Sequence, residues 1–505
     1  MNQSLALEIL LSGESALLTG PAGAGKTYVL NQFIALAKRD GKYVSVTATT
    51  GLAATHLGGT TIHSWAGIGV NDYLPNGFAD HIAKGRREII EKTDVLVIDE
   101  ISMLHDFRLD MVDEVCRLVR KKPDMPFGGI QIIMSGDFFQ LPPINRGDAR
   151  AGSFVVNADV WQELDPVICY LEEQHRQDDT QLIEILNAIR AGDVRRTHAE
   201  LLLSRTEVYP DDLERLTELH TVNVDVDILN EAKLADIDAD EISYEQSSTG
   251  SEQYIDTLQR SVLAPRTLRL KQGALVMAVK NSPDRKYVNG SIGTVIGFAP
   301  HTEYPIVAFQ HGKEVTMEPD TWELRDGDKK RAGITQIPLR LAWAITVHKS
   351  QGMTLDAARI DLRKAFVEGM GYVALSRVKN IDNLYLSGIN QMALRVSPEA
   401  QLIDIHLRDK ANEARQRFSH LEKKVQKRAA SPPKEIESSK VSWAQKIAKM
   451  REIYPNAYRP WLQRHDDELR QYFQQGESVA QLSKRLGRHE GSITMRLEKL
   501  FGEVQ

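Results

Sequence analysis

Short apolar runs alternate with stretches of helical periodicity through the first part of the chain. Residues 14–20 predict a buried strand that runs into a glycine-rich turn, and residues 26–42 carry apolar side chains at helical spacing. The segment 43–49 alternates like a strand, whereas 94–100 and 129–137 are continuous apolar runs, typical of strands buried on both faces. Strands that alternate with helices predict an α/β fold with a parallel sheet covered by helices on both faces.

The pattern changes in the second half of the chain. Residues 265–333 contain short β-like runs separated by Gly, Pro and Asn, which predicts a small inserted antiparallel β-barrel. The α/β pattern resumes over residues 334–410. A charged helix and a linker rich in Ser, Pro and charge are expected over 411–440, and residues 441–505 are expected to form a separate helical module.

Composition and charge restrict the class of protein. The chain has 505 residues, of which 42% are hydrophobic and 26% charged, as in soluble globular proteins. The sequence has no apolar run of membrane-spanning length and no secretory or transit signal at its start, and its two cysteines are isolated. We therefore expect a cytoplasmic protein with no membrane partner, associated with the nucleoid if its source is bacterial. The net charge is −6, but basic residues exceed acidic ones from residue 411 onward, which fits a solubilising tail and a nucleic-acid contact equally well.

A phosphate-binding loop follows the first predicted strand. The sequence GPAGAGKT fits the pattern G-x-x-x-x-G-K-[ST], with a strand before it and a helix after it. Glycines let backbone amides close on phosphate oxygens, and the positive end of the helix attracts the same oxygens. In this chemistry Lys26 reaches the β- and γ-phosphates of ATP, and Thr27 ligates Mg²⁺. The expected ATP-binding residues of the loop are Gly20, Pro21, Ala22, Gly23, Ala24, Gly25, Lys26 and Thr27.

Two acidic residues mark the carboxyl edge of the predicted sheet, where ligands of open α/β sheets bind. Asp99 and Glu100 end the apolar run 94–100. We expect Asp99 to hold Mg²⁺, largely through water, and Glu100 to orient or deprotonate the attacking water. An acidic pair after a strand is otherwise commonly a helix N-cap, but the phosphate loop upstream favours the magnesium-nucleotide interpretation.

Three further residues are candidates for contact with the γ-phosphate. Gln140 lies in GDFFQLPP, after another buried strand, and is expected to sense the γ-phosphate or the attacking water. Arg176 and Arg377 come from distant segments and can meet at one nucleotide if two lobes face each other. There an arginine neutralises charge in the transition state. A lone arginine is more commonly part of a surface salt bridge, so the alternative role stays open for both.

Eight ordered motifs give a specific resemblance to a known family. They are GPAGAGKT, VTATTGLAATHLGG with TTIHSWAGIG, VLVIDEISML, GDFFQLPPI, LEEQHRQ, LKQGALVMAVKN with VNGSIGTV, AWAITVHKSQGMTLD and GYVALSRVKN. Over about residues 1–405 the set resembles the PIF-type (petite integration frequency) DNA helicases, superfamily 1 relatives of RecD that move 5′ to 3′. The resemblance implies two RecA-like lobes with ATP between them, single-stranded DNA running across both, and a small barrel inserted in the second lobe. The implied first lobe spans 1–175, and the implied second lobe spans 176–264 and 334–410.

The resemblance also implies roles for individual residues. It assigns Gln3 to the adenine, Gln351 and Gly352 to ATP binding and to the coupling of nucleotide to DNA, and a wedge element to about residues 70–92. The DNA-contacting positions that it implies are Thr50, His63, Ser64, Thr346, His348 and Lys349. The chain departs from the common family residues at Ala24, Thr27 and Thr49, where Thr, Ser and Pro are usual. None of these departures removes a catalytic group.

Two features leave alternatives open. Trp65, close to His63, either stacks on a DNA base or, as is commoner for Trp, anchors the core. The module 441–505 resembles helix-turn-helix or Myb-like units, whose last helix enters a DNA groove, but a helical protein-docking module also fits. The phosphate contacts expected in this module are Lys484, Arg485, Arg488 and Arg496.

The resemblance predicts an ATP- and Mg²⁺-dependent DNA helicase that moves 5′ to 3′ on single strands and unwinds duplex DNA in replication, recombination, repair or genome maintenance. We expect a monomer acting on single-stranded and forked DNA, and the sequence names no protein partner. Two alternatives remain: an ATP-driven translocase that displaces proteins without productive unwinding, and a nucleotide-switched DNA-binding regulator. Unwinding and protein-displacement assays distinguish the helicase from the first alternative, the translocase. DNA-stimulated ATP turnover argues against the second alternative, the regulator.

Overall fold

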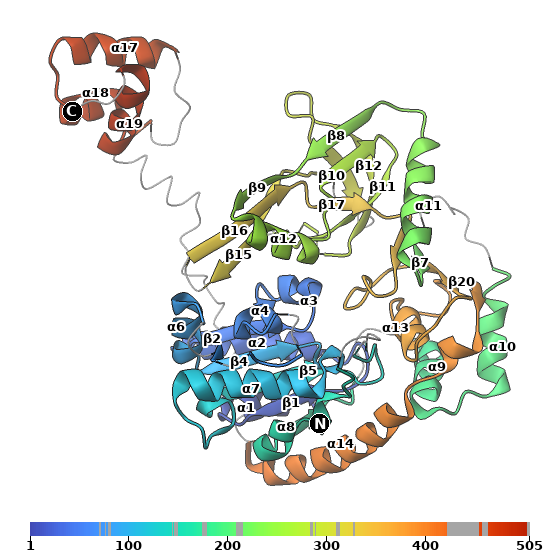
Figure 1. Ribbon diagram of the computed structural model, residues 1–505. Coiled ribbons are helices and arrows are strands. Elements are labelled where there is room, and N and C mark those ends of the chain that lie inside the picture. Colours follow the sequence, from blue (N-terminus) through green and yellow to red (C-terminus); the bar gives the residue numbers. More distant parts are fainter. Residues whose placement is uncertain are drawn as a thin grey trace. The chain divides into compact units, whose positions relative to one another are not determined.

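The chain folds into two compact units, Met1–Val425 and Gln426–Gln505, and each is described by itself (Figure 1). In the part of the chain that is described, no helix combines the length and the apolar character needed to cross a membrane. The structure is a computed structural model that describes residues 1–69, 72–75, 77–78, 82–143, 145, 150–173, 179–208, 216–282, 286–287, 289–309, 314–326, 329–421, 454–456 and 463–501.

The first lobe is built on a six-stranded parallel sheet. Its strands lie in the order β3 (Thr60–Thr61), β2 (Val44–Ala48), β4 (Val95–Asp99), β5 (Gln131–Gly136), β1 (Ala16–Thr19) and β6 (Val167–Tyr170). Alternate residues of a strand face opposite sides of a sheet. Leu17 of β1 and Leu96 of β4 accordingly lie in one apolar cluster, whereas Leu18 and Val95 lie in another. The continuous apolar runs in the sequence are therefore strands buried on both faces, as predicted.

Helices cover both faces of this sheet (Figure 1). On one side, α1 (Gln3–Leu11) and α2 (Lys26–Arg39) supply much of the apolar cluster that contains Leu18. On the other side, α4 (Ile62–Ala66), α6 (Lys84–Lys92) and α7 (Asp106–Arg120) join the cluster that contains Leu17. Two short helices complete the lobe, α3 (Gly51–His56) after β2 and α8 (Asp159–Leu164) before β6.

The expected wedge element at about residues 70–92 ends in α6. Ile90 of this helix is fully buried, and Arg120 of α7 donates to the carbonyl oxygens of Ile90 and Thr93 at 3.2 and 2.9 Å. This end of the element is therefore packed on the first lobe. Residues 70–71, 76 and 79–81 lie outside the described residues.

The second lobe contains a four-stranded parallel sheet. Its strands lie in the order β18 (Ala344–Thr346), β7 (Glu218–His220), β19 (Ala358–Leu362) and β20 (Leu384–Ile389). The helices that accompany it are α9 (Thr180–Ala191), α10 (Arg196–Ser204), α11 (Asn223–Ala235) and α13 (Met370–Leu375). Two lobes with parallel sheets confirm the predicted α/β class.

Antiparallel strands are inserted between α11 and β18, in sheets of five, three and two strands. The insertion begins at Glu241, earlier than the expected residue 265. The sequence pattern did not reveal its first two strands, because they are polar and largely exposed and lack an apolar run. It also contains α12 (Glu252–Ser261). In spatial order the sheets are β14 (Glu314–Thr316), β13 (Pro305–Phe309), β12 (Ile292–Phe298), β11 (Leu275–Ala278) and β17 (Leu339–Leu341); β15 (Asp320–Asp326), β16 (Lys329–Gln336) and β9 (Ser247–Gly250); and β10 (Thr267–Lys271) and β8 (Glu241–Glu245).

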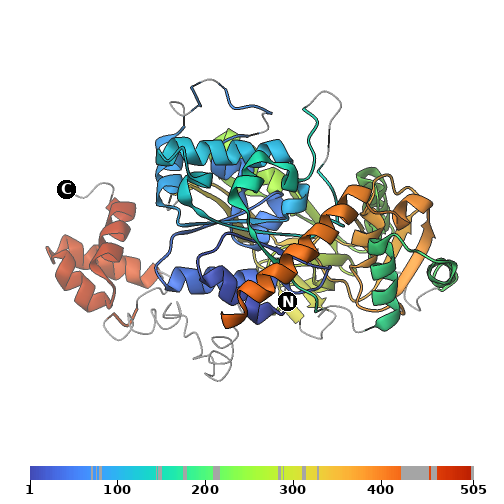
Figure 2. The same cartoon turned by 90° about the horizontal axis from the view of Figure 1, so that it is seen from below.

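One long helix, α14 (Pro398–Arg417), returns from the second lobe to the first (Figure 2). It packs along β6, where Tyr170 Oη donates to Asp404 Oδ1 at 2.7 Å. Ala414 and Phe418, at its end, join the apolar cluster formed by α1 and α2. The expected domain boundary at residue 410 therefore falls inside a helix that is part of the first unit.

The second unit contains three helices among its described residues, as predicted: α17 (Gln463–Gln474), α18 (Val479–Leu486) and α19 (Glu490–Phe501). Ser478 and Gln481 cap the start of α18 reciprocally, and Gly487 ends it with φ of 61°. The helices share a small core made by Leu469, Leu482, Leu486, Ile493 and Leu497.

Candidate active site and nucleic-acid interface

The phosphate loop joins β1 to α2 at the carboxyl edge of the first sheet. Gly23 and Gly25 have φ of 85° and 83°, a conformation that side chains disfavour. A Cβ on Gly20 would lie 2.4 Å from the carbonyl oxygen of Leu171. These glycines let the loop turn tightly into the N-terminus of α2, which presents backbone amides to an anion.

Lys26 and Gln3 both contact this loop. Lys26 Nζ donates to the carbonyl oxygens of Gly20 and Pro21 at 2.8 and 3.0 Å. Gln3 Nε2 donates to the carbonyl oxygen of Ala24 at 3.1 Å. The structure thus brings the glutamine at the start of the chain to the phosphate loop.

Asp99 and Glu100 lie where β4 ends. Asp99 is buried, and Glu100 has φ of 52°, which is uncommon for a residue with a side chain. Thr49 supports this turn, because its amide donates to the Asp99 carbonyl at 3.1 Å and its hydroxyl donates to the Glu100 carbonyl at 2.8 Å. The proline usual at this position in the family has neither donor, so the departure at Thr49 adds two hydrogen bonds here.

The environment of the two carboxyl groups favours their protonated forms. Burial and then the negative charge of Asp99 raise the pKa of Glu100 to about 7, against the opposing positive charges of Lys26 and Arg377. Burial also raises the pKa of Asp99. A bound cation stabilises neighbouring buried carboxylates. The donor set, with the Thr27 hydroxyl at the start of α2, therefore fits Mg²⁺.

Gln351 joins the two lobes at this site. Its Nε2 atom donates to Glu100 Oε2 at 3.0 Å and to Gln140 Oε1 at 3.1 Å. Gln140 and Gln351 are both buried, and Gly352 follows with φ of 80°. Three side chains from distant segments, all assigned to the nucleotide from the sequence, thus meet at one point.

Arg377 lies just after α13 and is 1% exposed. Its guanidinium donates to backbone carbonyl oxygens of the second lobe at 2.8–3.2 Å and to the Ser376 hydroxyl at 2.7 Å. These bonds fix its position, from which its charge lowers the pKa of Glu100. Arg176, the second candidate arginine, lies outside the described residues.

The candidate DNA contacts of the first lobe lie around α3 and α4. Thr50 precedes α3, while His63 and Ser64 lie in α4, and all three are partly exposed. Burial and then the positive charge of Arg108 lower the pKa of His63 to about 4, so its imidazole is neutral at physiological pH. Trp65 is 6% exposed and belongs to the main apolar cluster, so its ring anchors the core and does not stack on a base.

The candidate DNA contacts of the second lobe follow β18. Thr346 is 3% exposed and its hydroxyl accepts a hydrogen bond from the Lys349 amide at 3.3 Å, so the expectation that it contacts DNA is wrong; it shapes the turn instead. His348 and Lys349 are partly exposed. The His348 ring stacks against Phe366, with ring centroids 6.3 Å apart, and Phe366 is 60% exposed. Phe366 was not predicted from the sequence, because one aromatic residue in a loop makes no pattern.

The four basic candidates of the second unit differ in accessibility. Lys484 and Arg485 are exposed on α18. Arg496 donates to both carboxylate oxygens of Asp466 at 2.8 and 2.6 Å, which holds it within the module. Arg488 is 2% exposed, so the expectation of a phosphate contact there is wrong: its side chain lies in the interior of the module.

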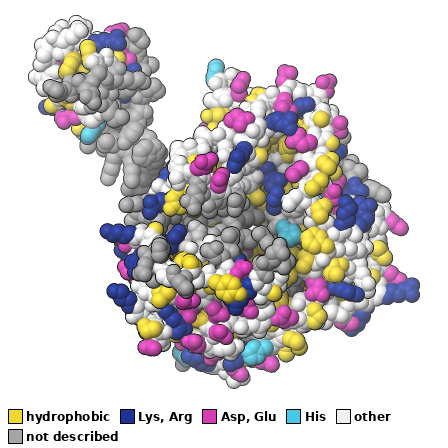
Figure 3. Space-filling model, viewed as in Figure 1, with side chains coloured by type: hydrophobic (Ala, Val, Ile, Leu, Met, Phe, Trp, Pro, Cys, Tyr) yellow, Lys and Arg dark blue, Asp and Glu magenta, His cyan; other side chains and the backbone are white. Residues whose placement is uncertain are grey.

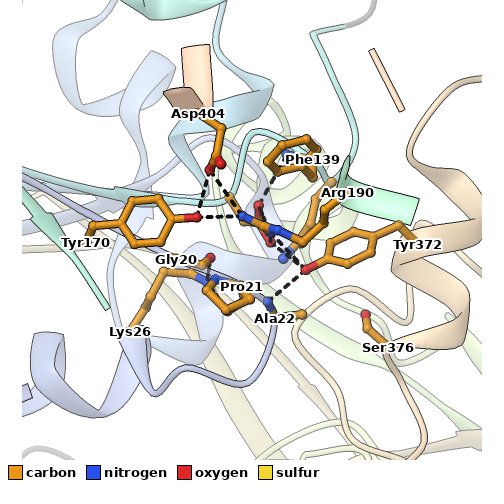
Figure 4. Close-up of polar contacts among 12 residues, drawn as sticks. Gly20, Pro21, Ala22, Lys26, Phe139, Tyr170, Arg190, Tyr372, Ser376 and Asp404 are labelled. Atoms are coloured by element: carbon orange, nitrogen blue, oxygen red, sulfur yellow. Dashed lines mark hydrogen bonds and ion pairs between the residues drawn. The ribbon is translucent and has the colours of Figure 1, made fainter. Parts of the chain in front are cut away.

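A buried polar network beside the phosphate loop was missed by sequence reasoning (Figure 4). Arg190 Nη1 donates to both carboxylate oxygens of Asp137, at 2.9 and 3.1 Å, and to Tyr372 Oη at 3.0 Å. Tyr372 Oη donates to Asp137 at 3.1 Å and accepts from the Ala22 amide at 3.0 Å. The Arg190 guanidinium also lies 4.1 Å from the ring centroid of Phe139. These residues are far apart in sequence, so no local motif unites them.

Comparisons with protein families cover most of the first unit. A family model described as PIF1-like helicase matches residues 4–200, and one described as DNA helicase Pif1, 2B domain, matches residues 253–298. An ATP-dependent DNA helicase Pif1 from Psychrobacter sp. (strain PRwf-1) is 39% identical over 485 residues, covering 84% of this chain and 73% of the relative.

Two solved structures extend the similarity to the fold. The Pif1 helicase of Bacteroides sp in complex with ADP-AlF4 is 29% identical with a TM-score of 0.70, and the match covers 81% of this chain and 97% of that chain. A structure of two coordinating Pif1 helicases, solved for DNA unwinding at forked duplex DNA, is 30% identical with a TM-score of 0.59. That match covers 82% of this chain and 98% of the other.

Proposed function

Because the chain belongs to the Pif1 family of ATP-dependent DNA helicases, we propose that it moves 5′ to 3′ along single-stranded DNA by cleaving ATP between its two lobes. It is an ATP-hydrolysing DNA helicase with a RecA-like α/β core. One observation carries the proposed site of cleavage: Gln351 of the second lobe donates to Glu100 and Gln140 of the first lobe. ATP cleavage beside these bonds would therefore act directly on residues of both lobes.

In the proposed site Glu100 accepts the proton of the attacking water. Its pKa of about 7 supports this role, because a general base works best when its pKa lies near the working pH. Gln140 orients the same water, and Arg377 neutralises negative charge that develops on the γ-phosphate. Lys26 exchanges its bonds to the Gly20 and Pro21 carbonyls for bonds to phosphate oxygens.

The residues that would hold the nucleotide and its metal come from the first lobe. Bound Mg²⁺ supplies a positive charge that neutralises the β- and γ-phosphates. The Thr27 hydroxyl and Asp99 would hold it, and the cation would offset the cost of two adjacent buried carboxylates. Gln3, which donates to the Ala24 carbonyl of the phosphate loop, would read the adenine.

One short segment couples this site to the DNA. His348 and Lys349 are partly exposed, and Gln351, two residues further on, is buried against Glu100 and Gln140. A change in the bonds of Gln351 during ATP cleavage therefore shifts the segment that carries the DNA-facing side chains. The nucleotide site and the DNA-facing side chains are therefore coupled through one segment of a few residues.

Single-stranded DNA binds in the proposed complex through base stacking and local positive charge. Phe366 and His348 offer stacked rings, and the partly exposed Lys349 follows His348 in the chain. Relatives of this chain have been solved with DNA. Figure 3 shows basic and acidic side chains interspersed over the coloured surface in view, so the coloured part of this side carries no broad basic face. Binding should weaken with salt and tolerate any sequence.

The remaining parts are proposed to act on the duplex. The inserted antiparallel strands form the small barrel of the second lobe, and the element at about 70–92 separates the strands of a fork. Residues 441–505 form a helix-turn-helix-like module that contacts DNA phosphates through Lys484 and Arg485, while a protein-docking role is the alternative. The chain is proposed to act as a monomer.

The decisive experiment measures ATPase rate with and without single-stranded DNA, together with unwinding of duplexes that bear a 5′ or a 3′ tail. The proposal expects DNA to stimulate turnover and only the 5′-tailed duplex to be unwound. Equal, slow turnover with and without DNA would instead favour a nucleotide-switched regulator. DNA-stimulated turnover without unwinding, but with removal of a protein block, would favour a translocase.

A further inference from the structure

Tyr372 uses the full hydrogen-bonding capacity of its hydroxyl in a buried site. A phenol hydroxyl has one donor and two acceptor positions. It donates to Asp137 Oδ2 at 3.1 Å and accepts from the Ala22 amide and from Arg190 Nη1, both at 3.0 Å. Tyr372 and Asp137 are each 1% exposed, and Arg190 is 6% exposed. Water therefore has little access to replace any of these bonds.

The hydroxyl and two of its partners belong to three different parts of the candidate active site (Figure 4). Ala22 lies in the phosphate loop. The Asp137 carbonyl accepts from the Gln140 amide at 3.0 Å, which places the aspartate in the turn that presents Gln140. Tyr372 itself lies on α13, and Arg377, just beyond this helix, donates from Nε back to a carbonyl of α13 at 2.8 Å. One hydroxyl thus connects the loop, the turn of Gln140 and the helix that holds Arg377.

We propose that Tyr372 is a positioning residue that holds the phosphate loop and helix α13, which precedes Arg377, in the relative placement needed for ATP cleavage. The inference rests on the function proposed above. Tyr372 acts through Ala22, Asp137 and Arg190 rather than on a phosphate. Removal of its hydroxyl leaves a buried amide and a buried ion pair each short of one partner, a loss that the surroundings relieve only by shifting.

Tyr170 provides a matched control at the far end of the same network. Its hydroxyl also makes three bonds: it accepts from Arg190 Nη2 at 2.9 Å and Arg408 Nη2 at 2.6 Å, and it donates to Asp404 at 2.7 Å. The residue is 2% exposed. It shares Arg190 with Tyr372, but these three bonds reach neither the phosphate loop nor α13.

The experiment compares Tyr372→Phe and Tyr170→Phe in the full-length chain. We measure DNA-stimulated kcat, the Kd for a fluorescent non-hydrolysable ATP analogue, and the melting temperature. Tyr372→Phe should lower kcat about tenfold, because a displaced phosphate loop and Arg377 would stabilise the transition state less, and should leave the analogue Kd within about threefold. Both variants should lower the melting temperature by a similar amount, because each loses a buried hydroxyl with three hydrogen bonds. Tyr170→Phe should nevertheless keep kcat within about twofold of the parent.

Two results would overturn the inference: a Tyr372→Phe enzyme whose kcat stays within about twofold of the parent, or equal losses of kcat in both variants, which would make the network merely structural. If Tyr372→Phe does not fold, Arg190→Lys replaces it, and the expected split between a low kcat and an unchanged analogue Kd is the same. Absence of DNA-stimulated turnover in the parent chain would remove the proposed function before any variant is compared.

Discussion

ATP turnover by this chain should rise about tenfold between pH 6 and pH 8. Burial and the neighbouring Asp99 raise the pKa of Glu100 to about 7, and only its ionised form accepts a proton from water. A group with this pKa is about one-tenth ionised at pH 6 and about nine-tenths ionised at pH 8. The rate at low ATP, which reports kcat/KM and therefore the free enzyme, should follow that ionised fraction.

The assay is a steady-state ATPase measurement at saturating single-stranded DNA, in buffers of constant ionic strength. Circular dichroism at each pH verifies that the protein is folded. Glu100→Gln should lower the rate by about 10²–10⁴-fold and remove the acidic limb of the profile. Tyr170→Phe, whose hydroxyl has no bond to Glu100, should retain that limb. A flat profile in the parent chain, or normal turnover by Glu100→Gln, would refute Glu100 as the base.

The same carboxyl group makes stability depend on pH. Its pKa in the folded chain exceeds the ordinary value of 4.5, so the folded state holds the proton more tightly. The contribution of Glu100 to the free energy of unfolding is complete below pH 4.5 and is lost as pH rises through about 7. The free energy of unfolding changes by up to about 3 kcal/mol over this range. Glu100→Gln should therefore raise the melting temperature at pH 8 and change it little at pH 4.5; a reduced melting temperature at pH 8 would contradict this.

Further predictions concern the loop, the DNA track and the terminal module. Lys26→Ala should abolish ATP turnover and keep the Kd for a single-stranded oligonucleotide, measured by fluorescence anisotropy, within about threefold; residual turnover near the parent rate would contradict its role. Phe366→Ala should weaken that Kd by about 5–100-fold, as expected for lost stacking, while Phe366→Trp should retain it; unchanged binding by Phe366→Ala would exclude the stacking site. Deletion of residues 441–505 should weaken DNA affinity and spare DNA-stimulated turnover of the remaining chain; equal affinity would leave the module without a DNA role.

The parts of this fold that follow from near neighbours in sequence could be predicted. The phosphate loop depends on glycines between a strand and a helix, and the structure has β1 and α2 in those places. The carboxyl edge with Asp99 and Glu100 follows from an apolar run that ends in two acids. Gln140 and Gln351 lie 211 residues apart, and the bond between them was not predicted: Gln140 was placed at the nucleotide by its position after a buried strand, and Gln351 by family resemblance.

The parts that depend on burial were not accessible from residue type. Thr346 and Arg488 occupy positions where polar side chains suggested DNA contact, yet tertiary packing encloses both. The inserted domain begins with strands whose side chains are mostly exposed, so the alternation that marks a strand has no apolar face to reveal it. The bond between Tyr372 and Ala22 spans 350 residues and belongs to no motif with a fixed spacing.

The long helix α14 gives the two lobes a second physical tether, in addition to the chain that runs from β6 to α9. Its side chains clasp β6 through Asp404 and Tyr170, and its last turn lies in the apolar cluster of α1 and α2. A chain cut before Pro398 would lose these contacts with β6 and with the cluster of α1 and α2, and with them one of the links between the lobes.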